Sequence, residues 1–591
     1  MDTHLKCDIP LRSTTKNIGV MLLNNRDNYG DMNAFAQVEE GPYQFWTWNQ
    51  LVDDIITFAA YLETKGLKKG DHIGIISRNY YHRLVVEMAV MASGYVSVPI
   101  FHRYTEEMMS HLLEFSDVKM LILVNYWRLE YLPTDNKPLL VMATPEFPRK
   151  KYPFENQVEF FEDVMRKTNP TPEQRSAIEQ TFRDVEADDT CLVMFTSGTT
   201  RFPKGVILSH KNIMTQQSAL EDLWKPEPGM RFLCYLPWHH SFGGLFERFF
   251  ALHSGGCLAV DDSWGKDISK LLENFATIKP HIYFSVPKVY KEIISRVLVS
   301  KEAEATFFHD ELKYVFTAAA PLDTSISDIF KKKSVPVVEG WGLTETSPCC
   351  TLTGLLLDRQ PGVVGFPIPG VEVKLAEDNE ILVRGVNVMK GYYKLPEVTA
   401  AVLDEDGWFK TGDLGAITEE GLQILARKDR VFKLSNGEKV FPSMLERNIG
   451  NLCKFIKHAY IFGAGQDHPC ALLFPNRELL DSDEISVLDE VECVHPDKSD
   501  SLTACFSRCL HKINCHQDVK FEHIQKAIII DQELTLERDE LTPSFKIIAR
   551  NIEKNYKEYI DCMMENKTDH LPDNAYVVEV CTCRDQPETE D

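Results

Sequence analysis

Apolar positions along the first 125 residues alternate between two spacings, one typical of helices and one typical of buried strands. Residues 48–64 carry apolar side chains three and four positions apart, which predicts an amphipathic helix. Residues 72–77 form a short apolar run, which predicts a buried strand. The same alternation continues, with helices predicted near 81–93 and 104–114 and strands near 95–100 and 120–124. Strands that alternate with helices predict a parallel sheet with helical crossovers.

The remainder of the chain predicts a second set of strands and a smaller C-terminal part. The polar segment 142–188 predicts an irregular connection with one helix at 172–183. Alternating runs and glycines across 363–400 predict a small antiparallel unit. The acidic segment 481–518 is interpreted as an insertion. Further strands are predicted near 191–195, 232–237, 258–261, 281–285, 315–317, 337–341 and 457–463, and helices near 267–276, 443–451 and 548–560.

These elements predict an α/β protein. Its large N-terminal domain would hold parallel or mixed sheets with crossover helices plus the small antiparallel unit, and a small α+β domain would follow. The length of 591 residues is also too great for a single core. The formal net charge of −24 argues against nucleic-acid binding and against attraction to acidic membranes.

Cysteine usage and the terminal segments bear on the compartment. The 15 cysteines have no regular spacing, which indicates reduced thiols, and zinc binding at Cys581 and Cys583 would require two more ligands. The N-terminus lacks an apolar signal-peptide core, and the apolar stretch 85–101 is interrupted by Glu87. We expect a cytoplasmic protein, and leave weak peripheral membrane contact and the oligomeric state open.

The stretch from Thr196 to Gly205 concentrates hydroxyl groups, glycine and one lysine between two predicted elements. Glycine lets backbone N–H groups turn toward an anion, and the hydroxyls and the lysine add donors for phosphate oxygens. The spacing is not that of a Walker loop. A polar surface turn is the simpler interpretation of such a cluster taken alone. The phosphate-binding candidates are Thr196, Ser197, Gly198, Thr199, Thr200 and Lys204.

Later blocks add candidates that could each be ordinary structural features. Trp341 offers a stacking face, and Glu345 offers a carboxylate suited to Mg²⁺. Asp413 is predicted on a Gly-rich turn, where its carboxylate could accept hydrogen bonds from both hydroxyls of a ribose. His239 and His240 are adjacent, and neighbouring side chains rarely bind one ion, so an aromatic core turn is an equal alternative.

In their order along the chain, these blocks resemble the adenylate-forming superfamily of acyl-CoA synthetases, luciferases and adenylation domains. Thr196 to Gly205 is similar to its phosphate loop, with Arg201 where glycine is usual. Leu236 to His240 is similar to a stretch beside the acyl carboxylate, and the two glycines that follow differ from the condensation-domain His-His motif. Arg427 to Glu438 and Leu541 to Lys546 are closest to long-chain acyl-CoA synthetases.

The resemblance implies ATP and Mg²⁺ as cofactors and CoA as co-substrate. The substrate that it implies is a carboxylic acid, and among carboxylic acids a medium- or long-chain fatty acid. It implies an N-terminal domain at 1–425, a hinge at 426–430 and a mobile domain at 431–563, and we expect a disordered tail at 564–591. The implied catalytic residues are Lys546, His240, Thr344 and Glu345, with Glu345 and Thr196 at the metal. The implied nucleotide-binding residues, besides those of the loop, are Ala319, Ala320, Pro321, Gly340, Trp341, Gly342, Leu343, Thr344, Glu345, Asp413 and Arg427.

Two alternatives remain open at this point. The chain could be an adenylating enzyme that passes the acyl group to a carrier protein or makes no thioester. Any carrier would be a separate protein, because no carrier-domain block is present in the sequence. The chain could also be an inactive nucleotide- or acyl-binding homologue, because arginine at position 201 costs about 1 kcal/mol if the position needs positive φ, and its side chain could fill the phosphate space.

Overall fold

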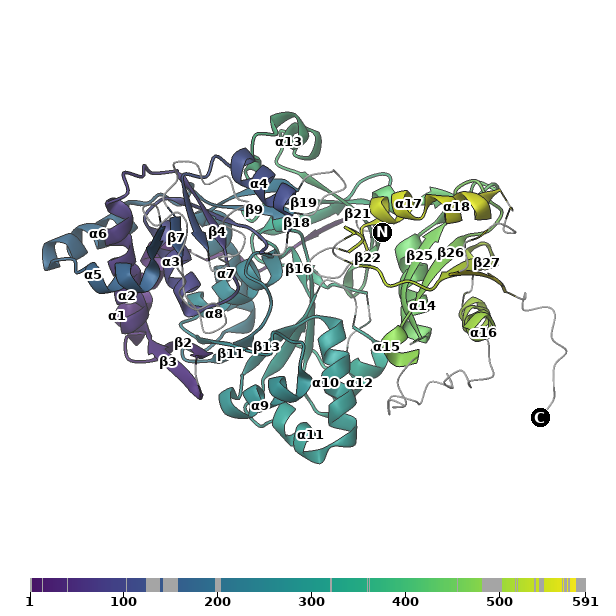
Figure 1. Ribbon diagram of the computed structural model, residues 1–591, viewed down its shortest axis with the longest axis horizontal. Helices are drawn as coiled ribbons and strands as arrows, with labels where there is room; N and C mark the ends of the chain where they lie inside the picture. Colours follow the sequence, from purple (N-terminus) through teal and green to yellow (C-terminus); the bar gives the residue numbers. More distant parts are fainter. Residues whose placement is uncertain are drawn as a thin grey trace. The chain divides into compact units, whose positions relative to one another are not determined.

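The computed structural model divides the chain into two compact units (Figure 1). Unit 1 comprises Met1–Ala376, Ile381–Thr411 and Ile417–Gln423, and unit 2 comprises Glu377–Glu380, Gly412–Ala416 and Ile424–Asp591. The structure describes residues 3–580 without 13, 40, 103, 124–138, 142–157, 197–202, 319–321, 359, 361, 454, 481–501, 516, 518, 536–537, 542–546, 566, 568–570 and 572–573.

The first large sheet of unit 1 has eight strands in the order β20-β10-β9-β5-β4-β6-β7-β8. Its strands from β9 to β8 in this order run parallel to their neighbours, while β10 is antiparallel to both β9 and β20. The predicted parallel sheet with crossovers is therefore confirmed. The strands are β4 (His72–Ile76), β5 (Val96–Pro99), β6 (Met120–Leu123), β7 (Leu139–Val141), β8 (Val158–Phe160), β9 (Thr190–Thr196), β10 (Lys204–Ser209) and β20 (Gly391–Tyr392).

The second large sheet of unit 1 has nine strands in the order β17-β16-β15-β14-β13-β11-β12-β2-β3. Pairs from β15 to β2 are parallel, and the strands at both edges are antiparallel. The strands are β2 (Asn33–Val38), β3 (Tyr43–Thr47), β11 (Arg231–Cys234), β12 (Cys257–Val260), β13 (Ile282–Ser285), β14 (Tyr314–Thr317), β15 (Val337–Trp341), β16 (Thr351–Leu352) and β17 (Phe366–Pro367).

Two sets of unit 1 helices pack together beside these sheets (Figure 1). Helices α1, α2 and α6 contact one another, and α9, α10 and α11 form a second packed set. The helices are α1 (Ile18–Tyr29), α2 (Trp48–Glu63), α3 (Tyr81–Ala92), α4 (Glu106–Phe115), α5 (Phe161–Lys167), α6 (Pro172–Asp184), α7 (His210–Trp224), α8 (Arg248–His253), α9 (Ile268–Ile278), α10 (Pro287–Val299), α11 (Lys301–Phe307), α12 (Thr324–Lys332) and α13 (Pro396–Val402).

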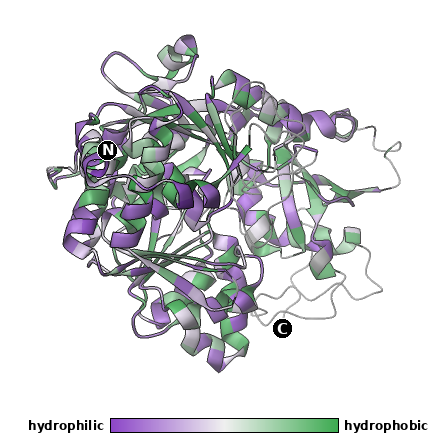
Figure 2. Cartoon of the chain, turned by 60° about the vertical axis from the view of Figure 1, so that its left-hand side comes forward, coloured by the Kyte–Doolittle hydropathy of each residue, from purple (hydrophilic) through white to green (hydrophobic). Residues whose placement is uncertain are grey.

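Helix α2 shows how local sequence sets an element. The Thr47 side chain accepts from the Gln50 N–H while the Gln50 side chain accepts from the Thr47 N–H, so the first turn has both donors satisfied. The apolar stripe predicted from spacing is buried, and Ile55 and Leu62 are fully enclosed. Burying each such side chain contributes roughly 1.5–3 kcal/mol. Figure 2 shows the same separation of hydrophobic and hydrophilic residues across many helices.

A smaller five-stranded sheet has the order β1-β18-β19-β21-β22. Strands β18 (Val371–Leu375) and β19 (Glu380–Gly385) pair antiparallel, which confirms the prediction for this region. Strand β1 (His4–Lys6) pairs with β18 from the other end of the chain, and three residues were too short a pattern to predict it. The remaining strands are β21 (Phe409–Thr418) and β22 (Gly421–Arg427).

Unit 2 contains a four-stranded sheet in the order β25-β26-β27-β28, covered on both faces. Alternate residues of β25 and β26 enter two different hydrophobic clusters, so Ile461 belongs to one and Tyr460 to the other. Helices α14 and α16 contribute to the first cluster, and α17 and α18 to the second. The elements are β23 (Phe432–Lys433), β24 (Lys439–Val440), α14 (Pro442–Leu452), β25 (Ile456–Phe462), β26 (Cys470–Pro475), α15 (Arg477–Leu480), α16 (Leu502–Cys515), β27 (Lys526–Ile530), α17 (Ala549–Asn555), α18 (Lys557–Met564) and β28 (Ala575–Glu579).

Three expectations about elements are corrected. The segment 142–188 contains strand β8 and helix α5 besides the predicted helix α6. The helix predicted at 548–560 is two helices, α17 and α18, separated at Tyr556. The strand predicted to reach Pro237 ends at Cys234, because the residues that follow form a turn that hydrogen-bonds within itself.

Candidate active site

The ends of the predicted phosphate loop are well defined in unit 1. Strands β9 and β10 are antiparallel, with Thr196 opposite Lys204. The Thr196 hydroxyl donates to the carbonyl oxygen of Lys204 at 3.5 Å. Lys204 therefore lies in a strand at the end of the loop. The candidates Ser197, Gly198, Thr199 and Thr200, and also Arg201, lie outside the described residues.

Tyr392 connects two of the predicted site residues. Its hydroxyl donates to Glu345 Oε1 at 2.8 Å, and Lys204 Nζ lies 5.0 Å from the centroid of its ring. Tyr392 is placed there by β20, in which it pairs with Val206 of β10. A cation over an aromatic face is attracted by the ring quadrupole. The structure thus brings the candidate cation and the candidate carboxylate onto one tyrosine, which sequence reasoning missed.

Glu345 follows β15 in a short 3₁₀ turn, Thr344–Thr346. Its side chain is buried at 8 % exposure, and its backbone carbonyl accepts from the Met389 N–H at 2.8 Å. Gly342 is required before this turn, because a Cβ there would lie 1.9 Å from the carbonyl oxygen of Pro348. A Cβ at Gly340 would lie 2.7 Å from the ring of Phe316. These glycines allow the close approach that carries Glu345 back toward β10.

Two buried amide side chains hold the segment after Glu345. Asn387 Nδ2 donates to the carbonyl oxygens of Thr346 at 3.0 Å and Cys349 at 2.9 Å. Gln216 Oε1, from α7, accepts from the Cys349 N–H at 2.7 Å. Trp341, Leu343 and Thr344 are partly exposed on this segment. The candidates Ala319, Ala320 and Pro321 lie outside the described residues.

His240 lies in the turn between β11 and the π-helical segment Phe242–Glu247. Its side chain is exposed, and its Nδ1 accepts from the Phe242 N–H at 3.3 Å. The adjacent His239 packs against Phe101 with ring centroids 4.4 Å apart. Burial, followed by the charge of Arg83, holds the pKa of His239 well below its ordinary value. His239 is therefore neutral at physiological pH, and His240 is the member of the pair that faces solvent.

Within unit 2, the predicted ribose ligand and the predicted hinge arginine contact each other. Arg427 Nη1 lies 2.9 Å from Asp413 Oδ1. Asp413 is in strand β21 and not on a turn, so that expectation was wrong. Gly412 adopts φ of 72°, which bends the strand without ending it. The strand that carries Asp413 begins at Phe409 and continues to Thr418.

A second ion-pair group adjoins this pair in unit 2 and was also missed. Lys428 Nζ lies 2.7 Å from both Asp378 Oδ2 and Glu380 Oε2, and Glu380 Oε1 accepts from the Gly412 N–H at 3.1 Å. The hydrogen bond from Lys428 holds the pKa of Asp378 below its ordinary value. No periodicity signals this group, because its carboxylates lie at the turn before β19 and at the start of β19, while its lysine lies in the distant 3₁₀ segment Lys428–Arg430. Lys546, Cys581 and Cys583 lie outside the described residues.

The chain belongs to the AMP-binding enzyme family: the family model matches residues 24–393, and a model of the AMP-binding enzyme C-terminal domain matches residues 429–568. The peroxisomal long chain acyl-CoA synthetase 7 of Arabidopsis thaliana is 26% identical over 594 residues, covering 88% of this chain and 82% of that protein. A chloroplastic long-chain-fatty-acid–acyl-carrier-protein ligase of the same plant is 25% identical, covering 94% of this chain and 88% of the relative.

A solved structure shares the fold. O-succinylbenzoate CoA synthetase from Bacillus subtilis, in complex with ATP and a magnesium ion, has a TM-score of 0.69 at 19% identity, covering 91% of this chain and 99% of the other. The family match makes this chain an adenylate-forming enzyme of the acid–thiol ligase type. The solved structure shows its fold, a large N-terminal domain of mixed sheets and a small C-terminal domain. Among the described residues, no helix is long and apolar enough to cross a membrane.

Proposed function

We propose that this chain activates a medium- or long-chain fatty acid with ATP and then transfers the acyl group to CoA. The observation that carries the proposal is the convergence of Lys204 and Glu345 on Tyr392. The cation for phosphate oxygens lies in β10, and the carboxylate for a metal is hydrogen-bonded to Tyr392 of β20, the strand that pairs with β10. The choice of a fatty acid as substrate is supported by the similarity to a long chain acyl-CoA synthetase, at 26% sequence identity.

In the first half-reaction, a carboxylate oxygen attacks the α-phosphorus of ATP, an acyl-phosphate bond forms, and pyrophosphate leaves. The protein must position two anions and stabilise the charge that develops on the phosphate oxygens. Lys204 and the loop from Thr196 to Thr200 would bind the β- and γ-phosphates. Lys546 would bind the acid and an α-phosphate oxygen, and His240 would lie beside the acid. In the second half-reaction, the CoA sulfur attacks the acyl carbon and AMP leaves.

The donor set around Glu345 fits Mg²⁺. Glu345 offers one carboxylate, with one oxygen fixed by Tyr392, and the hydroxyl of Thr196, at the end of β9, would be the second ligand. Mg²⁺ is commonly held by one or two protein oxygens while waters and substrate phosphates complete its octahedron. When bound, the ion would neutralise charge on the departing pyrophosphate. Asp413, Arg427 and the block from Gly340 to Thr344 would bind the nucleoside, together with Ala319, Ala320 and Pro321.

Pyrophosphate release from ATP and Mg²⁺ tests this function, with a panel of acids from acetate to oleate and with CoA or a carrier protein as acceptor. We expect release that rises with chain length and yields acyl-CoA. If a thioester forms only on the carrier protein, the carrier protein and not CoA is the acceptor. ATP binding without pyrophosphate release from any acid would contradict the enzyme assignment and favour an inactive homologue.

The effect of Arg201 is tested by Arg201→Gly. We expect the rate of pyrophosphate release to change by less than about tenfold, equivalent to about 1.4 kcal/mol of barrier. Glycine restores the residue that is usual in related loops, and arginine adds a cation near the departing pyrophosphate that could offset any backbone strain. A gain of several orders of magnitude would show that arginine blocks the site.

A further inference from the structure

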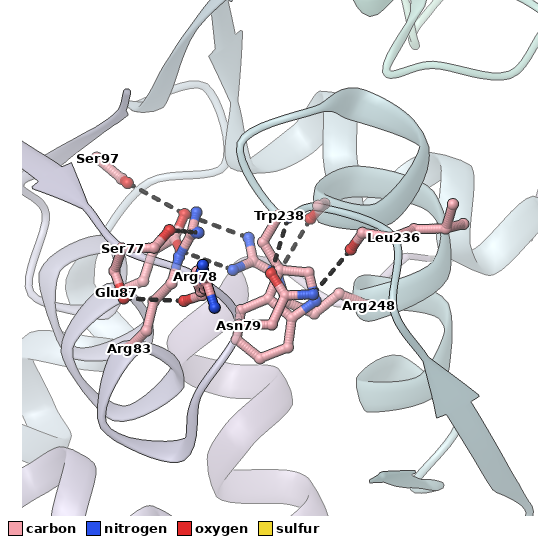
Figure 3. Close-up of polar contacts among 10 residues, drawn as sticks. Ser77, Arg78, Asn79, Arg83, Glu87, Ser97, Leu236, Trp238 and Arg248 are labelled. Carbon is pink, nitrogen blue, oxygen red and sulfur yellow. Dashed lines mark hydrogen bonds and ion pairs between the residues drawn. The ribbon is translucent and has the colours of Figure 1, made fainter. Parts of the chain in front are cut away.

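A fully buried charge cluster lies behind the turn that carries His240 (Figure 3). Arg248 Nη1 lies 2.7 Å from Glu87 Oε2, and Arg83 Nε lies 3.2 Å from the same oxygen. All three side chains are at most 1 % exposed. Burial raises the pKa of Glu87, but the charges of Arg248 and Arg83 outweigh it and lower the pKa overall. The three groups are therefore ionised and carry a net charge of about +1 inside the core.

Such a cluster needs a reason other than stability. Desolvating two arginines and one glutamate is unfavourable, and buried ion pairs can often be replaced by apolar side chains without loss of stability. Their best-attested advantage is that they specify one arrangement of the groups around them. The cluster is bonded to Ser77, whose carbonyl oxygen accepts from Arg83 Nη1 at 2.7 Å, and to Ser97, whose hydroxyl donates to Glu87 Oε1 at 3.2 Å. On its other side it contacts the Trp238 ring, which belongs to the turn from Leu236 to His240.

Asn79 and the two arginines contact the turn from its N-terminal side. Asn79 Nδ2 donates to the Leu236 carbonyl oxygen at 2.8 Å, and Asn79 Oδ1 accepts from the Trp238 N–H at 3.0 Å (Figure 3). The Trp238 ring is fully buried, with the Arg248 guanidinium 5.1 Å and the Arg83 guanidinium 5.7 Å from its centroid. These contacts hold both the backbone and the indole of the turn.

The same turn is held from the C-terminal side. Arg248 Nε donates to the Gly244 carbonyl oxygen at 3.1 Å, and the Gly244 N–H donates to the His240 carbonyl oxygen at 2.7 Å. A Cβ at Gly243 would lie 2.4 Å from the Leu236 oxygen, and one at Gly244 would lie 2.2 Å from the Trp238 oxygen. The two glycines therefore let the π-helical segment close directly onto the turn.

We propose that Asn79 and Arg248, supported by Arg83 and Glu87, are positioning residues that hold the turn Leu236–His240 so that His240 reaches the acid. The proposal rests on the proposed function for the role of His240. It requires that loss of Asn79 acts on the reaction through His240 and not through general loss of structure.

Hydrogen exchange of the full chain tests the positioning without any turnover. Asn79→Ala should raise the exchange rate of amides in 236–244 by about tenfold, because two bonds to the turn are lost. The matched control is Asn25→Ala, since Asn25 is also buried and its Nδ2 donates to the Leu252 carbonyl oxygen at 2.7 Å. Exchange of 236–244 should be unchanged in that control. Equal exchange in Asn79→Ala and the wild type would overturn the proposal.

A double-mutant cycle tests the link to the reaction, with palmitate and octanoate as probe acids. Asn79→Ala should lower kcat for pyrophosphate release about tenfold in the wild type and less than about twofold in His240→Ala. Equal losses in both backgrounds would mean that Asn79 does not act through His240. If Asn79→Ala folds poorly, Arg248→Lys replaces it in the cycle with His240→Ala. Lysine keeps the charge but cannot donate from two nitrogens to both oxygens of Glu87, as Arg248 does. If exchange of 236–244 rises in Asn79→Ala as expected but the wild type releases no pyrophosphate, the proposed function is overturned, and the role of His240 with it.

Discussion

Tyr392 contributes to the candidate site in two ways that can be separated. Its hydroxyl fixes one oxygen of Glu345, and its ring lies under Lys204. A net hydrogen bond to a charged partner contributes roughly 1.5–3 kcal/mol, more than the cation–ring contact at a partly exposed site. The hydroxyl is therefore expected to matter more for the metal than the ring matters for the phosphate cation.

Tyr392→Phe removes the hydroxyl and keeps the ring. We expect kcat for pyrophosphate release to fall about tenfold and the Mg²⁺ concentration needed for half-maximal rate to rise, because Glu345 loses its fixed orientation. Tyr393→Phe is the matched control, since the Tyr393 hydroxyl donates to Asp117 at 2.9 Å on the exposed side. If both variants behaved alike, Tyr392 would have no specific role in orienting Glu345.

His210 makes the stability of unit 1 depend on pH. Its ring is fully buried, its Nδ1 accepts from the Ile18 N–H at 3.3 Å, and burial lowers its pKa to about 4. Between about pH 6.5 and 4 the unfolded chain binds a proton that the folded chain does not, so stability falls as pH falls through this window. Below about pH 4 both states are protonated and this contribution stops changing.

His210→Asn should flatten this dependence. We expect the fall in free energy of unfolding between pH 6.5 and 5 to be smaller in the variant by about 1 kcal/mol per pH unit, measured by urea unfolding. His281, whose pKa burial also lowers to about 4, titrates in both proteins and cancels in the comparison. A slope identical to that of the wild type would show that His210 does not carry the linkage.

At the scale of elements, the sequence predicts what depends on neighbouring residues. The stripe on α2 and the apolar runs of β4, β5 and β6 are local patterns, and the structure confirms them. The pairing of β20 with β10 and the bond from Tyr392 to Glu345 join residues that are distant in the chain, which no spacing rule detects. Asp413 was misplaced for a different reason, because glycines such as Gly412 were interpreted as a turn, while the structure continues the strand through Gly412.

The 3₁₀ segment Lys428–Arg430 lies within the hinge proposed at 426–430, and its contacts favour one residue as the pivot. Arg430 lies 2.6 Å from Glu446, and its guanidinium lies 4.5 Å from the Tyr460 ring, both in unit 2. Arg430 is therefore fixed to the body that follows it. A rotation of that body would use the backbone dihedrals before Arg430, which are those of Asp429.

Asp429→Pro tests the hinge because proline fixes φ near −65°. We expect thioester formation to slow at least about tenfold, while pyrophosphate release stays within about threefold of the wild type. Asp429→Ala controls for the lost carboxylate and should retain both steps. Loss of both steps in the proline variant would instead indicate a folding defect or a different pivot.

At the scale of the whole molecule, the two half-reactions make opposite demands on the C-terminal part. Adenylation needs a cation on the acid and the α-phosphate, which we assign to Lys546. Thioester formation needs access for the CoA sulfur to the acyl carbon. We propose that rotation of the mobile domain about the hinge withdraws Lys546 and opens this access. One chain can satisfy both demands only one after the other. Different variants should therefore lose the first step alone or the second step alone.

Lys546→Ala should lose the first step alone. We expect pyrophosphate release to fall at least about a hundredfold, because the carboxylate of the acid must then approach the α-phosphate of ATP without a cation between them. Thioester formation from supplied acyl-adenylate and CoA should stay within about tenfold of the wild type, the reverse of Asp429→Pro. Lys554→Ala, on helix α17, controls for the loss of one positive charge from the same unit. If Lys546→Ala slowed both steps equally, a single fixed arrangement would serve both half-reactions and the proposed rotation would be unnecessary.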